Sequence, residues 1–287
     1  MKNAMQLRDL SKKVAKEHNI SAQFVLQNYM QERLLARISN SRFKSNFILK
    51  GGFLISALLG IQARTTMDMD VTVRKLKVDI QTMKDIFSEI CKIKMDDKII
   101  FKLTNIEEIR QTDIYSGMRI HIDAIFLPIV AKLKVDITVG DKITPKEIKF
   151  KYNFLFEKGN ISVLAYNIES ILAEKLETIL SRRVLNTRMR DFYDIYILLK
   201  LKNKEIDMEL SNKALIATAK RRGTVEILTN YRKIILEIKK NEYMQKLWEK
   251  YRNEYFYANN IKFDLICKNI LKFLNGIKML NPSHNAR

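Results

Sequence analysis

The chain has 287 residues, and 47% of them are hydrophobic, which is enough apolar material for a large core. Its 52 Lys and Arg residues outnumber 32 Asp and Glu residues, giving a net charge of +20. Such an excess favours polyanionic partners, although a lysine-rich proteome would also produce it. Two cysteines and three histidines argue against a disulfide framework and a zinc cluster, and no apolar stretch is long enough to span a membrane. We therefore expect a reduced, cytoplasmic protein without a membrane segment.

In chain order, the first predicted elements are helices. Apolar residues recur at three- and four-residue spacing through residues 5–40, which predicts two helices, with Ser21 as the N-cap of the second. A short buried helix is expected over 53–60, directly after a glycine pair. An amphipathic pattern predicts a further helix over 77–94.

Most of the remaining first half has the composition or the period-two alternation of β-strands, and the periodicity is helical from Asn167 onward. We therefore predict an α+β fold, with a mixed sheet and flanking helices in residues 1–160 and a helical domain in residues 161–287. The predicted strands are 68–73, 98–106, 117–126, 131–140 and 149–157.

Three carboxylates are candidates for a metal site. Asp68 and Asp70 lie one residue apart on a predicted strand, so their side chains project from the same face, where a divalent cation would relieve their repulsion. Asp136 occupies the polar face of the segment 131–140. If the two strands are neighbours, Asp136 completes a site of the kind that holds two Mg²⁺ ions about 4 Å apart. Asp123 is the alternative third carboxylate, and a solvated strand face is the alternative explanation for Asp136.

The glycine pair Gly51 and Gly52 stands immediately before the predicted helix over 53–60. Backbone N–H groups at a helix N-terminus bind phosphate, and glycine permits the positive φ angles and the close approach that such a turn needs. A glycine pair followed at short range by Asp-x-Asp therefore predicts a phosphate-binding turn.

Two charged residues lie on the apolar stripes of predicted helices in the second half. Lys175 stands four residues after Ile171 and four before Ile179, and Asp191 precedes Ile195 by four. A charge that points inward needs a partner, because burial of an unpaired charge is costly. The two residues either pair with each other for structural reasons, or Lys175 neutralises a triphosphate while Asp191 orients it.

The segment 211–252 contains eleven basic and four acidic residues, interleaved with Tyr231, Tyr243, Trp248 and Tyr251. Basic groups contact phosphates, and aromatic faces can stack on exposed bases. Each aromatic residue, taken singly, fits the core of an amphipathic helix better than a surface. The segment as a whole favours RNA binding.

The order of these features resembles the DNA polymerase β-type nucleotidyltransferase fold. Within that fold, "LKGGF", "RTTMDMDV", "ILAEKLETILSR" and "RMRDFYDIYILLK" are similar to motifs of the AbiEii/AbiGii toxin family, a group that includes MenT-type toxins. The motifs span Leu49 to Lys200 in the family's order. The resemblance implies the toxin of a toxin–antitoxin or abortive-infection (phage-defence) system, acting as a nucleotidyltransferase that uses an NTP and Mg²⁺.

The resemblance also implies a substrate and residue roles. The best-understood relatives add nucleotides to tRNA 3′ ends, so RNA, an NTP and a cognate antitoxin are the expected partners. Asp68 and Asp70 would be metal ligands as well as catalytic residues, and Lys175 and Asp191 the later catalytic pair. Family members usually carry Ser or Thr after the glycines, where this chain has Phe53. The nucleotide-binding residues would be Gly51, Gly52, Arg64, Thr66 and Lys175.

Two other functions are compatible with the sequence. One is a nucleotide- or RNA-binding regulator without turnover, and the other is a nucleotidyltransferase that modifies small molecules such as antibiotics. The preferred NTP, the RNA species, the oligomeric state and direct contact with the antitoxin are left open.

Overall fold

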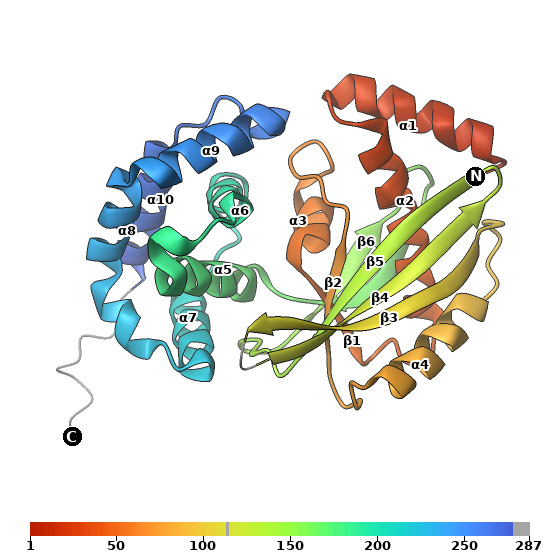
Figure 1. The fold of residues 1–287 in the computed structure, drawn as a ribbon, viewed down its shortest axis with the longest axis horizontal. Coiled ribbons are helices and arrows are strands. Elements are labelled where there is room, and N and C mark those ends of the chain that lie inside the picture. The colour runs from red at the N-terminus through yellow and green to blue at the C-terminus, as the bar shows by residue number, and fades with distance from the viewer. Residues whose placement is uncertain (113–114, 278–287) are drawn as a thin grey trace. The chain divides into compact units, whose positions relative to one another are not determined.

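The computed structural model of the chain describes residues 1–112 and 115–277, which form two compact units (Figure 1). Unit 1 comprises residues 1–141 and 147–166, and unit 2 comprises residues 142–146 and the chain from residue 167 onward. The observed division lies after the predicted one at residue 160, because strand β7 (Asn160–Ala165) is hydrogen-bonded into the sheet of unit 1. The predicted α+β fold, a mixed sheet with flanking helices followed by a helical part, is confirmed.

Unit 1 is built on a seven-stranded mixed sheet with the order β3-β4-β5-β2-β1-β7-β6. The β2–β5 and β1–β7 pairs are parallel, whereas the other neighbouring strands are antiparallel. The helices α2, α3 and α4 pack on strands of this sheet, and α1 packs on α2 (Figure 1). The elements are α1 Ala4–His18, α2 Ala22–Asn40, β1 Phe47–Lys50, α3 Gly51–Leu59, β2 Met69–Val73, α4 Ile80–Lys92, β3 Ile100–Thr112, β4 Tyr115–Phe126, β5 Ile129–Val139, β6 Ile148–Asn153 and β7 Asn160–Ala165.

Unit 2 is helical in the part of the chain that the structure describes. Asn167 caps α5 by accepting a hydrogen bond from the N–H of Ser170, and Asp207 caps α7 in the same way through Leu210. None of the helices in the described ranges is long and apolar enough to cross a bilayer. The elements are α5 Ile168–Arg182, η1 Arg183–Leu185, α6 Met189–Leu201, α7 Met208–Arg222, η2 Val225–Asn230, α8 Tyr231–Lys240, α9 Glu242–Glu254, η3 Phe256–Ala258 and α10 Phe263–Gly276.

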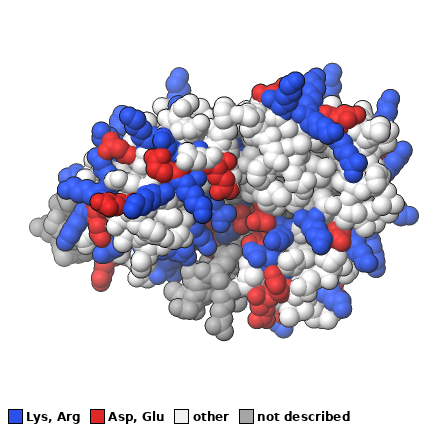
Figure 2. Space-filling view, turned by 45° about the horizontal axis from the view of Figure 1, so that its top comes forward, with Lys and Arg blue, Asp and Glu red and all other residues white. Residues whose placement is uncertain are grey.

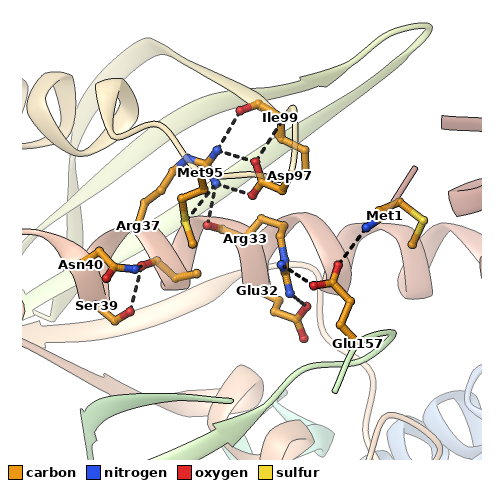
Figure 3. Close-up of polar contacts among 11 residues, drawn as sticks. Met1, Glu32, Arg33, Arg37, Ser39, Asn40, Met95, Asp97, Ile99 and Glu157 are labelled. Atoms are coloured by element: carbon orange, nitrogen blue, oxygen red, sulfur yellow. Dashed lines mark hydrogen bonds and ion pairs between the residues drawn. The ribbon is translucent and has the colours of Figure 1, made fainter. Parts of the chain in front are cut away.

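The charged side chains of the buried helix α2 find partners inside unit 1 (Figure 3). Arg37 donates hydrogen bonds to both carboxylate oxygens of Asp97, at 2.7 and 2.8 Å, and to the carbonyl of Ile99 at 2.8 Å. Both members of this ion pair are buried. Because Asp97 and Ile99 immediately precede β3, Arg37 fixes the entry of the chain into that strand.

A second network on α2 involves a carboxylate that burial makes hard to ionise (Figure 3). Glu32 is fully buried, and it accepts hydrogen bonds from Arg33 at 2.5 Å and from the N–H of Leu155 at 2.7 Å. Arg33 also contacts Glu157 at 3.4 Å. Burial raises the pKa of Glu32 to about 7, although the charge of Arg33 acts in the opposite direction.

The raised pKa of Glu32 predicts a pH-dependent stability. The ordinary carboxyl pKa of 4.5 applies to the unfolded chain, so the folded state binds the proton more tightly than the unfolded state between pH 4.5 and about 7. The stabilisation that comes from the tighter binding of this proton is therefore fully present below pH 4.5, and it is lost as the pH rises through about 7. In urea titrations, wild type should therefore lose stability relative to Glu32→Gln as the pH rises. We expect the difference in the free energy of unfolding, Glu32→Gln minus wild type, to be roughly 2–3 kcal/mol larger at pH 8 than at pH 5. Glu89→Gln, at an exposed ion pair, should follow wild type at both pH values, and parallel pH profiles for all three proteins would contradict the assignment.

Candidate active site

The turn between β1 and α3 is shaped around a carboxylate. Gly51 begins α3 with a φ of +65°, a conformation that residues with a Cβ rarely adopt. A Cβ added to Gly51 would lie 2.6 Å from Cγ of Asp70, which is closer than real contacts allow. Glycine is therefore required at position 51 both by the backbone and by the carboxylate packed against it.

The second glycine of the turn faces two of the predicted nucleotide-binding residues. A Cβ added to Gly52 would come within 3.1 Å of both Nη2 of Arg64 and Oγ1 of Thr66. Arg64 is buried and donates to the carbonyl of Thr65, and Thr66 donates to the carbonyl of Asp68 at 3.2 Å. The structure thus brings Arg64 and Thr66, two predicted nucleotide-binding residues, next to the glycine turn at the N-terminus of α3.

Gly51→Ala is expected to lower the free energy of unfolding by about 2–4 kcal/mol, because the methyl group adds a steric clash to the strain of the positive φ. Gly223 is a matched control, since its φ of +68° is similar but nothing lies within 4 Å of an added Cβ. Gly223→Ala should cost only about 1 kcal/mol. Urea unfolding followed by circular dichroism measures both, and equal losses would show that the contact with Asp70 is unimportant.

The strand register brings two of the predicted metal ligands together. β2 and β5 are parallel neighbours, and Asp70 is the register partner of Asp136. Met69 and Val71 are buried on one face of β2, so the alternating Asp70 projects from the opposite face, and Asp68 stands immediately before the strand.

The rival carboxylate lies elsewhere on the sheet. Asp123 on β4 is the register partner of Lys132 on β5, whereas the position opposite Asp136 on β4 belongs to Arg119. The structure therefore places Asp136, and not Asp123, beside Asp70. Asp136 is also 8% exposed, so a freely solvated strand face does not describe it.

Two amides of α2 hold the backbone that carries these carboxylates. Gln31 donates to the carbonyl of Met67 at 2.8 Å, immediately before Asp68, and Gln27 donates to the carbonyl of Lys132 on β5 at 2.8 Å. Both glutamines are buried. Polar residues on a buried helix thus position the start of β2 relative to β5.

Asp136 forms a bidentate ion pair in this structure. Nε and Nη2 of Arg119 donate to its two carboxylate oxygens, each at 2.8 Å, and these hydrogen bonds raise the pKa of Arg119. Among the described residues, no group of three Asp, Glu, His or Cys side chains is arranged to hold a metal ion. Asp68, Asp70 and Asp136 supply carboxylate oxygens, which are the ligands that Mg²⁺ prefers, so the donor set fits this ion in its chemistry.

A further ion pair next to the glycine turn has no local signal in the sequence. Nζ of Lys50, the register partner of Asp70, lies 2.6 Å from Oδ2 of Asp141, which follows β5. Burial disfavours the charged form of Asp141, but Lys50 and the hydroxyls of Thr138 and Thr72 outweigh it and keep the pKa below its ordinary value. Lys50 and Asp141 are far apart in the chain and meet only through the sheet.

In unit 2, Lys175 on α5 pairs with two carboxylates of α6. Its Nζ lies 2.8 Å from Asp191 and 2.8 Å from Asp194. Burial disfavours the charge on Lys175, but the two carboxylates outweigh that effect and raise its pKa. Lys175 and Asp191 pair with each other, which is one of the two alternatives that the sequence left open. Asp194, which is fully buried, was not predicted as a site residue, although its position three residues after Asp191 puts it on the same helix face.

Phe53, which directly follows the glycine pair, belongs to the core. It is fully buried and stacks on Tyr152 with 5.6 Å between the ring centroids. A hydroxyl group is still present at the turn, because the side chain of Thr66 lies next to Gly52.

The basic segment of unit 2 is partly engaged in ion pairs and partly exposed. Arg222 pairs with Glu177, and Lys239 with Asp264. Trp248 is fully buried and donates to the carbonyl of Ile261, so it is a core residue and not a surface for bases. Over the face of the molecule drawn in Figure 2, Lys and Arg side chains are spread widely, with smaller groups of Asp and Glu among them. The exposed residues of the segment include Lys220, Lys240, Tyr243, Lys246 and Lys250.

The chain is similar to one protein family and to several solved structures. A family model described as "Nucleotidyl transferase AbiEii toxin, Type IV TA system" matches residues 33–269. No curated protein matches significantly. Among solved structures, JHP933 from Helicobacter pylori is 18% identical, with 89% of this chain and 94% of that chain covered and a TM-score of 0.46. A second H. pylori structure is 16% identical, with 91% and 100% covered and a TM-score of 0.47. An antigenic nucleotidyltransferase-like protein from Paracoccidioides brasiliensis is 15% identical, with 71% and 93% covered and a TM-score of 0.38.

Proposed function

Since the chain belongs to the AbiEii nucleotidyl transferase toxin family of type IV toxin–antitoxin systems, we propose that it transfers a nucleoside monophosphate from an NTP to RNA, with the tRNA 3′ end as acceptor. One observation carries the proposal. The glycine turn, Asp70 and Asp136 lie together on the sheet of unit 1, with Asp70 packed against Gly51 and in register with Asp136.

The turn is suited to the triphosphate. Backbone N–H groups at the start of α3 supply donors for phosphate oxygens, and the guanidinium of Arg64 and the hydroxyl of Thr66 lie beside Gly52. A fixed set of donors binds the triphosphate in one orientation, which is the main contribution that a protein makes to phosphoryl transfer.

Asp68, Asp70 and Asp136 would hold Mg²⁺, with two ions as the expected number. When bound there, Mg²⁺ would supply Lewis-acid chemistry, lowering the pKa of an attacking hydroxyl and stabilising negative charge on the pyrophosphate leaving group. The carboxylates themselves stay fixed because Gln31 and Gln27 of α2 hold the adjoining backbone.

We assign the second catalytic pair to Lys175 and Asp191, in the roles that the family likeness implies. By that likeness Lys175 would be the cation of the pair, and Asp191 the carboxylate that orients it. Asp194 adds a second negative partner at 2.8 Å, which keeps Lys175 charged despite its burial.

The acceptor contacts are assigned to exposed residues of unit 2. Lys220, Lys240, Lys246 and Lys250 are exposed and available for RNA phosphates, and Tyr243 is 55% exposed. Membership of a toxin–antitoxin family also implies a cognate antitoxin as a partner in the cell.

The test is incubation of the purified protein with Mg²⁺, each α-³²P-labelled NTP in turn, and either total tRNA or RNA depleted of tRNA. We expect label on tRNA 3′ ends from at least one NTP, and none in the presence of EDTA. Salt-sensitive RNA binding without label transfer from any NTP would favour the regulator instead. Label on an aminoglycoside but not on RNA would favour the small-molecule enzyme.

A further inference from the structure

A cation of the protein itself, Arg119, is paired with one carboxylate of the predicted metal site. Arg119, Asp136 and Asp70 are consecutive register partners across β4, β5 and β2, so they form one row on the sheet. Both oxygens of Asp136 accept hydrogen bonds from Arg119, at 2.8 Å each. The charges of Asp68 and Glu107 also act on Arg119. The guanidinium is therefore bound to Asp136, one of the three carboxylates that a divalent cation would need, and it is near enough to Asp68 to interact with its charge.

This arrangement has two opposing physical consequences. Carboxylates in register on neighbouring strands repel each other, and Arg119 relieves that repulsion, so it stabilises the folded chain. A bidentate hydrogen-bonded guanidinium also occupies the lone pairs through which Asp136 would bind a metal. The side chain of Arg119 is 31% exposed, so it has room to leave Asp136 without disturbing the core.

We propose that Arg119 is a positioning residue that holds Asp136 in place before a divalent cation binds and is displaced from it when the cation arrives. The inference rests on the proposed function, because it concerns the same carboxylates. Arg119 then sets how tightly the site binds a divalent cation. Its loss should strengthen metal binding while it weakens the fold, whereas loss of a merely structural residue weakens both.

The measurement is the binding of Mn²⁺ alone, without NTP or RNA, followed by electron paramagnetic resonance of the free ion. We expect Arg119→Ala to bind Mn²⁺ with a Kd about tenfold lower than wild type. Arg119→Lys keeps the charge but cannot form the bidentate pair, so its Kd should lie between the two. Thermal melting should show Arg119→Ala less stable than wild type without metal, and more strongly stabilised by saturating Mn²⁺.

Arg42→Ala is the matched control, because Arg42 pairs with Glu89 in an exposed ion pair of the same unit and its removal changes the net charge equally. Its Mn²⁺ affinity should match wild type. Equal affinities for Arg119→Ala, Arg119→Lys and Arg42→Ala would overturn the inference and leave the proposed function standing. Asp70→Ala is made both in the wild-type chain and in the Arg119→Lys variant. If it weakens Mn²⁺ binding in neither, the metal site of the proposed function is wrong, and the role of Arg119 is wrong with it.

Discussion

Asp70→Ala is expected to reduce nucleotide transfer to RNA by a factor on the order of a thousand or more. Asp70 is the carboxylate that contacts the glycine turn and is also in register with Asp136, so its removal affects both the metal ligands and the turn. The measurement is the initial rate of label transfer from the preferred NTP under single-turnover conditions. Circular dichroism should show an unchanged fold, because the side chain of Asp70 is partly exposed.

Asp123→Ala is the matched control for this loss. Asp123 is also a strand aspartate of the same sheet, but its register partner is Lys132 and it lies away from Asp70. We expect its transfer rate to stay within about twofold of wild type, as for a surface substitution outside the site. A full rate for Asp70→Ala, or an equally large loss for Asp123→Ala, would contradict the assignment of the carboxylates.

Lys175→Met is expected to destabilise unit 2 by about 3–5 kcal/mol, which is the usual cost of removing one partner from a buried ion pair. Asp194 is fully buried and Asp191 is 7% exposed, so both carboxylates would be left without their cation in a poorly solvated site. Trp248 is the only tryptophan of the chain and is buried in unit 2, so its fluorescence during urea unfolding reports on this part of the protein.

The control for Lys175→Met is Lys213→Met, which breaks an exposed pair with Glu209 in the same unit and should leave the unfolding midpoint nearly unchanged. The double variant Lys175→Met with Asp194→Asn should recover part of the loss, because it removes one of the two stranded charges. A loss for Lys175→Met no larger than that for Lys213→Met would show that the pair is solvated and contributes little.

The fold could be predicted from the sequence wherever one face of an element is buried and the other is not. The strand over 131–140 was predicted from its period-two alternation of apolar and polar residues. In β5 buried residues alternate with exposed ones from Ile129 to Lys134, whereas residues 135–138 are buried on both faces. The amphipathic helix α4 was predictable for the same reason, since its buried residues recur at helical spacing.

Two strands are too short for such a pattern to predict them. β1 is only four residues long and buried throughout, so it shows no alternation. β7 has six residues, and only Val163 and Ala165 are buried. Their pairing in the sheet depends on partners distant in the chain, which local periodicity cannot identify.

The same distinction applies to the site. The grouping of the glycine pair with Arg64, Thr66 and Asp70 was predictable, because these residues lie close together in the sequence. The contact between Arg119 and Asp136 requires the register of β4 on β5, and that of Lys50 with Asp141 requires several strands to assemble first. No sequence spacing encodes either pair.

The most direct measurement is a crystal structure of the protein with Mn²⁺ and a non-hydrolysable NTP, read from the anomalous signal of the metal. The proposed mechanism predicts Mn²⁺ bound to oxygens of Asp68, Asp70 and Asp136, phosphates on the N–H groups of the Gly51–Gly52 turn, and Arg119 withdrawn from Asp136. An anomalous peak held by other residues, with the Arg119–Asp136 pair intact and the nucleotide away from the turn, would contradict it.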